Sequence, residues 1–74
     1  MKKILWTSPN GKWKIVIISW RDWERIAVTD DWFMDYPIQY DNGHIVYDYP
    51  ERIPQYVKEQ VYKVMDEVKL ETVH

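Results

Sequence analysis

Residues 33–54, FMDYPIQYDNGHIVYDYPERIP, decide the fold because they encode a complete β-hairpin. Asn42-Gly43 lies between two runs of alternating residues and is typical of a two-residue type I′ turn. Such a turn pairs residues whose numbers sum to 85. One face then holds six apolar or aromatic side chains: Tyr36, Ile38, Tyr40, Ile45, Tyr47 and Tyr49. We interpret the two Asp-Tyr-Pro triplets that flank the turn as the closed ends of this hairpin, not as a repeated binding motif.

A first hairpin is expected over residues 2–19, around the turn sequence Ser8-Pro9-Asn10-Gly11. Pro suits the second position of a type I turn, and Gly suits the left-handed residue that follows it. A three-residue loop pairs Ser8 with Lys12. This register puts Leu5, Trp13, Ile15 and Ile17 on one face, and Ile4, Trp6, Lys14, Val16 and Ile18 on the other. The second strand is therefore apolar on both faces, which favours a central position in the sheet.

The remaining elements are a middle strand and a helix. Residues 20–23 predict a turn or bend, residues 24–29 alternate as a strand, and residues 32–34 are expected to re-enter the core or pack over its edge. Residues 54–70 predict a helix whose first position is Pro54. Its apolar stripe, extended at the entry by Ile53, is Val57, Val61, Val64, Met65 and Val68.

Together these elements predict a single α+β domain over residues 1–74. It has a small antiparallel sheet of about four to five strands, made of two hairpins plus a middle strand, and one C-terminal helix packed on one face. The expected strands are residues 2–7, 12–19, 24–29, 36–40 and 45–49.

Several kinds of chemistry find little support in the residues. The chain has no cysteine and two histidines, so neither a disulfide framework nor a zinc site is expected. The two glycines both lie in predicted turns, so no phosphate-binding loop is expected. No nucleophile has a local base, and His44 beside Asp41 and Asp48 is best interpreted as a solvated hairpin tip. We therefore expect no enzyme activity, no metal and no cofactor.

Charge is distributed unevenly along the chain. Residues 1–29 carry six basic and two acidic side chains, whereas residues 30–74 carry four basic and ten acidic ones. The basic part is rich in rings, which makes single-stranded nucleic-acid binding the alternative function. Its candidate residues are Lys2, Lys3, Lys12, Trp13 and Lys14. The overall pI of about 5.6 argues against this alternative.

Protein binding is the function that the sequence favours. Five Trp, six Tyr and one Phe are more rings than one helix-covered sheet face is expected to bury, and such rings are enriched at interfaces. The expected partner site is the second sheet face, or an edge strand: Ile4, Trp6, Val16, Ile18, Trp20 and Trp23. The partner is another protein or a second copy, with a homodimer possible. No apolar run is long enough to cross a membrane, and a cytoplasmic location is expected because small secreted domains usually carry disulfides.

Overall fold

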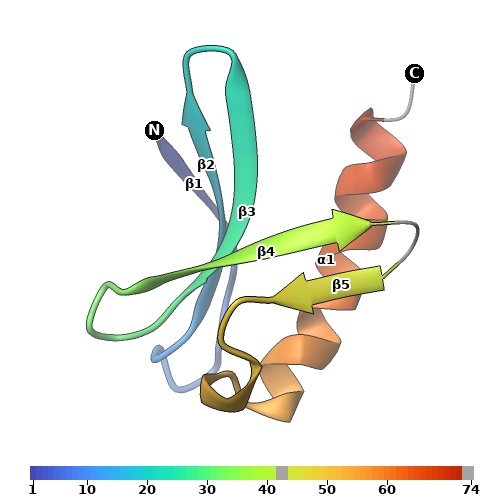
Figure 1. Cartoon of the computed structure of the whole chain (residues 1–74). Coiled ribbons are helices and arrows are strands. Elements are labelled where there is room, and N and C mark those ends of the chain that lie inside the picture. The colour runs from blue at the N-terminus through green and yellow to red at the C-terminus, as the bar shows by residue number, and fades with distance from the viewer. Residues whose placement is uncertain (42–43, 73–74) are drawn as a thin grey trace.

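The computed structural model describes residues 1–41 and 44–72, and it is an α+β domain as predicted. Its strands are β1 (Lys2–Thr7), β2 (Lys14–Trp20), β3 (Trp23–Thr29), β4 (Asp35–Asp41) and β5 (His44–Tyr47). A short 3₁₀ helix, η1 (Pro50–Arg52), leads into α1 (Gln55–Thr72). The strands form one antiparallel sheet in the order β1-β2-β3-β4-β5, with α1 packed across one face (Figure 1).

The hairpin that decides the fold has the predicted register. Ile38 pairs with Tyr47 and Tyr40 pairs with Ile45, so the numbers of paired residues sum to 85. The predicted type I′ turn itself, Asn42-Gly43, lies outside the described residues. The apolar pattern of the two strands therefore selects this register without help from the turn geometry.

One predicted pair of this hairpin is wrong. Tyr36 pairs with Val28 of β3, and β5 ends at Tyr47, so Tyr36 and Tyr49 are not cross-strand partners. The backbone cause is Pro37, which has no N–H to donate. Pairing of β4 with β3 stops at Pro37, and pairing with β5 starts at Ile38. The rings of Tyr36 and Tyr49 still meet edge-on, with centroids 6.0 Å apart.

The first hairpin differs from its prediction in loop length and register. Thr7 pairs with Lys14 and Trp6 with Ile15, whereas Ile4 pairs with Val16 as predicted. The register therefore shifts by one residue in β1, between Ile4 and Trp6, at a β-bulge. The loop spans residues 8–13, and the expected Ser8–Lys12 pair does not form.

Ser8 explains the longer loop. Its N–H donates to the Trp13 carbonyl (2.8 Å), and its buried hydroxyl accepts from the Trp13 N–H (3.0 Å). The Gly11 N–H donates to the Ser8 carbonyl (2.9 Å), and Gly11 has the expected positive φ of 75°. Side-chain hydrogen bonding thus closes a wider turn than the glycine pattern alone indicates.

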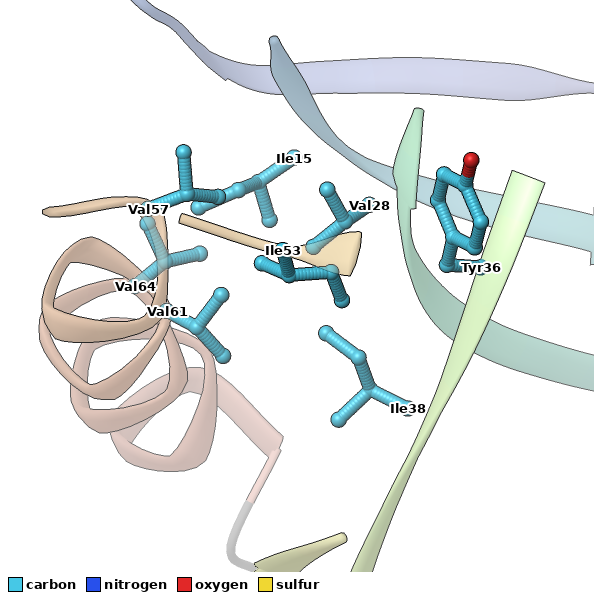
Figure 2. Packing of buried hydrophobic residues seen from close by; sticks show 8 residues of the cluster. All are labelled: Ile15, Val28, Tyr36, Ile38, Ile53, Val57, Val61 and Val64. Atoms are coloured by element: carbon cyan, nitrogen blue, oxygen red, sulfur yellow. The ribbon is translucent and has the colours of Figure 1, made fainter. Parts of the chain in front are cut away.

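The core lies between α1 and the sheet, where four side chains are fully buried: Ile15, Val28, Val57 and Val61. Figure 2 shows the helix valines directed toward Ile15, Val28 and Ile38 of the strands, with Ile53 between the two layers. The predicted stripe is confirmed through Met65, and the side chain of Val68 lies outside the described part. A valine-rich helix is a weak helix former on its own, so packing on the sheet stabilises it.

Candidate docking surfaces

The sheet face opposite α1, called the open face below, is only partly open. Residues paired across β1, β2, β3 and β4 place Ile4, Val16, Ala27 and Pro37 in one row on this face. Val16 is 2% exposed and Ala27 is 1% exposed, although no helix covers them.

The sheet itself provides that cover. Lys2 of β1 bonds Asp35 of β4 with a Nζ–Oδ1 distance of 3.0 Å, across the two intervening strands. The Thr29 hydroxyl donates to the same carboxylate oxygen (2.6 Å). Side chains of the first and fourth strands can meet in this way only if the sheet coils strongly over its open face. The centre of this face is therefore occupied by the chain's own coil.

An apolar strip remains exposed toward the end of the β2–β3 hairpin. We call it the strip; its members are Ile4, Ile18, Trp20 and Trp23. Trp20 and Trp23 form the last pair of the hairpin and are 58% and 46% exposed, and Ile4 is 55% exposed. Arg25 lies over the Trp23 ring, with its guanidinium carbon 5.6 Å from the ring centroid.

The hairpin turn that presents these two rings is tight. Arg21 and Asp22 alone connect Trp20 to Trp23, and Arg21 has a positive φ of 52°. Both common two-residue hairpin turns need a positive φ at this position. The predicted bend at residues 20–23 is thus a regular hairpin that points both tryptophans to the open face.

Two of the sequence-predicted partner residues lie elsewhere. Trp6 pairs with Ile15 and packs against the core cluster, so its predicted place on the second face is wrong. The β-bulge at Leu5 is the cause, because one extra residue turns both Leu5 and Trp6 toward the helix side. Val16 does lie on the open face but is buried.

The residues of the alternative site are not brought together. Trp13 packs against the core cluster, with its ring centroid 6.2 Å from that of Tyr36. Lys2 and Lys3 lie at the start of β1, whereas Lys12 and Lys14 lie at the other end of the first hairpin. Lys2 is already bonded to Asp35. A ring flanked by free cations, as base stacking requires, is not formed by this set.

The most exposed apolar side chains lie in a segment that the sequence analysis assigned to the core. Trp32 is 85% exposed, Phe33 is 80% exposed and Met34 is 54% exposed. They follow one another in the loop between β3 and β4, residues 30–34, which we call the 30–34 loop. Figure 1 shows this loop projecting from the body of the molecule. The expectation that residues 32–34 re-enter or cover the core is wrong.

Asp30 fixes the backbone of this loop. Its Oδ1 accepts from the backbone N–H of Trp32 and of Met34, both at 2.9 Å, and its Oδ2 accepts from the Tyr36 hydroxyl at 2.8 Å. The backbone adds an Asp30 N–H to Met34 carbonyl bond and a Phe33 N–H to Asp30 carbonyl bond, both at 3.1 Å. Five hydrogen bonds thus centre on one residue of a five-residue loop.

Electrostatics match this geometry. Partial burial acts to raise the pKa of Asp30, but hydrogen bonds from Met34, Tyr36 and Trp32 and the positive charge of Arg52 outweigh it and lower the pKa below its ordinary value. The hydrogen bond to Asp30 is the main cause that raises the pKa of the Tyr36 hydroxyl. Asp30 is therefore ionised at neutral pH and accepts all three bonds as a carboxylate.

Phe33 occupies a backbone conformation that large side chains rarely adopt. Its φ is 62°, in the left-handed region, which costs a non-glycine residue about 1–2 kcal/mol. The ring is exposed and gains little packing inside this chain to offset that cost. Strain of this kind at an exposed aromatic residue indicates a functional constraint.

A sequence signal for this loop did exist. Five residues that join two adjacent antiparallel strands are too few to fold back over the sheet, so three consecutive apolar residues there must project outward. The hydrophobicity of Trp32, Phe33 and Met34 hid this constraint.

Other features of the described residues carry no chemistry of their own. In that part of the chain, no three His, Asp or Glu side chains are grouped so as to hold a metal ion. No helix there is long and apolar enough to span a membrane. Comparison of the chain with models of protein families, with curated proteins and with solved structures found no match. The site must therefore be argued from its own geometry.

Proposed function

We propose that this chain is a non-enzymatic protein-binding module whose principal docking element is the 30–34 loop. One observation carries the proposal: Trp32, Phe33 and Met34 are exposed in sequence on a loop that Asp30 holds in a strained conformation. Trp is the residue most enriched among those that dominate binding energy, and a pre-ordered loop loses little entropy on binding.

The partner surface fits a definite description. An apolar pocket is needed for the Trp32 and Phe33 rings. The neighbouring carboxylates of Asp30 and Asp35 are both hydrogen-bonded within the chain. Asp31 is exposed beside Trp32, so a basic group at the rim of the pocket would complement it. The proposed partner is a protein with an apolar pocket and a basic rim.

A cytoplasmic location is part of the same proposal. It is supported by the absence of cysteine from a 74-residue sequence, since small extracellular domains usually depend on disulfides.

Selection from a random-peptide library displayed on phage tests protein binding. Peptides enriched on the wild type should bind a Trp32→Ala/Phe33→Ala variant at least about tenfold more weakly, because each buried ring contributes one to several kcal/mol. A Tyr56→Ala/Tyr62→Ala variant is the matched control, because it also removes two exposed rings, on α1. Peptides that bind all three proteins equally would exclude the 30–34 loop as the docking element.

Single-stranded nucleic acid remains the alternative partner and has less support, because Trp13 packs into the core and Lys2 is paired. Titration of short RNA and DNA oligomers at low salt separates the two functions. Amide shifts at residues 2–3 and 12–14 would support the alternative, and their absence removes it.

A further inference from the structure

The strip of one copy and the 30–34 loop of another have complementary properties. Around the strip lie Lys3, Arg21, Arg25 and the N-terminal ammonium group, which is held at the hairpin end by a 2.8 Å bond to the Ser19 carbonyl. Asp22 and Glu24 are the acids there, so this end of the sheet carries a net positive charge of 2: four cations less two carboxylates. The strip is thus an apolar surface with a basic rim, which is the description derived above for the partner of the loop.

The two surfaces of one molecule cannot meet. Trp23 and Thr29 are the two ends of β3, a seven-residue strand, and the loop begins directly after it. At about 3.3 Å per residue, β3 holds the strip and the loop about 20 Å apart. Any contact between them must therefore join two copies.

Resting on the proposed function, we propose that a second copy of this chain is a partner of the 30–34 loop, in a head-to-tail contact. Trp32 and Phe33 of one copy lie against Ile18, Trp20 and Trp23 of the next. The free carboxylate of Asp31 lies toward Arg21 and Arg25, which gives the contact its direction, because loop-to-loop and strip-to-strip pairings bring like charges together.

This geometry has a consequence that a two-fold dimer does not share. A head-to-tail contact leaves one loop and one strip free at the two ends of every dimer, so association continues into longer chains or a closed ring. Two rings on each side bury about 150–250 Å² apiece. The contact is therefore smaller than a stable interface of roughly 1,200–2,000 Å², and association is weak and concentration-dependent.

Sedimentation velocity on two variants, alone and mixed, tests the proposal. Trp32→Ala/Phe33→Ala removes the loop surface and Trp20→Ala/Trp23→Ala removes the strip surface. Up to about 1 mM, the wild type should show a mass that rises beyond a dimer, and each variant alone should remain a monomer. A 1:1 mixture should stop at a dimer, because one variant supplies the strip and the other supplies the loop.

Charge exchange gives a second test that does not depend on removing rings. Asp31→Lys and Arg21→Glu should each weaken self-association at least about fivefold, and mixing the two should restore a contact between the altered loop and the altered strip. The control is Tyr56→Ala/Tyr62→Ala, which should associate like the wild type.

Three results would overturn the proposal: a wild type that is monomeric at about 1 mM, a ring-substituted variant that still self-associates, or a mixture of variants that stays monomeric. A monomeric wild type that still selects loop-dependent peptides would refute self-association and leave the proposed function standing. Loss of peptide binding together with intact self-association would do the reverse for other protein partners.

Discussion

At the scale of single residues, Asp30 links the stability of the chain to its candidate function. Its side chain accepts three hydrogen bonds, and the loop that it organises presents the most exposed rings of the described residues. Sequence patterns find an aspartate after a strand but do not show which N–H groups it will accept from. That information depends on the loop conformation, which local hydrogen bonding decides.

Replacement of Asp30 should therefore cost stability. Asp30→Ala leaves the Trp32 and Met34 N–H groups and the Tyr36 hydroxyl without their acceptor, and we expect a loss of about 1–3 kcal/mol in the free energy of unfolding by urea. Asp31→Ala is the matched control and should change stability by less than about 0.5 kcal/mol. Equal effects of the two substitutions would contradict the role assigned to Asp30.

The lowered pKa of Asp30 also predicts a pH dependence. A carboxyl group whose pKa is lower in the folded state stabilises the fold above the pKa of the unfolded chain, about 3.9. This contribution is lost as the pH falls from there through the folded value. The wild type should thus lose more stability between neutral pH and acid than Asp30→Asn does, and parallel curves would show that Asp30 is not held as described.

Phe33 is a residue for which stability and function are expected to conflict. Phe33→Gly relieves the positive φ at an exposed position, so the free energy of unfolding should rise by up to about 1 kcal/mol. Trp32→Gly, at a neighbour whose φ is not positive, should lower it. A Phe33→Gly variant destabilised by more than about 1 kcal/mol would show that the ring packs in the fold.

Tyr47 carries a buried hydroxyl with no hydrogen-bond partner among the described residues. Burial raises its pKa to about 12, with a further contribution from Tyr62. Stability should be complete below pH 10, the ordinary value for Tyr, and fall as the pH rises toward 12, since the unfolded chain loses its proton first. Tyr47→Phe should be as stable as the wild type at neutral pH and lose this alkaline decline; a destabilised Tyr47→Phe would indicate a hidden partner.

At the scale of elements, the sequence predicted best where a periodic pattern meets the core. The β4–β5 register and the helix stripe follow from alternation and from spacings of three and four residues. The first hairpin was harder, because a one-residue bulge at Leu5 has no signature in the apolar pattern. That single shift moved Trp6 from the predicted partner site to the core.

The packing of α1 gives the element-scale prediction. Val61 is fully buried between the helix and the sheet, so Val61→Ala should cost about 1–3 kcal/mol through lost burial and a residual cavity. Val46 in β5 is 52% exposed, and Val46→Ala is the control, with an expected cost below about 1 kcal/mol. Thermal unfolding of both variants checks this, and a similar cost at the two positions would contradict the assigned core.

At the scale of the whole molecule, the five tryptophans divide into two groups. Trp6 and Trp13 pack against the core, whereas Trp20, Trp23 and Trp32 are largely exposed, at the two ends of β3. The sequence indicated a surplus of rings but could not say which ones, because that depends on the bulge in β1 and on the short 30–34 loop. The basic and acidic halves of the sequence become, in space, a basic rim around the strip and an unpaired carboxylate beside Trp32.

Fluorine NMR of protein labelled with 5-fluorotryptophan tests the central claim, that the exposed rings are docking groups, most directly. The spectrum contains one resonance per tryptophan and is followed from about 20 µM to about 1 mM protein, or on addition of a selected peptide. We predict that the Trp32 resonance moves in both titrations, that Trp20 and Trp23 move with protein concentration, and that Trp6 and Trp13 stay in place. A Trp32 resonance that moves in neither titration would contradict the account.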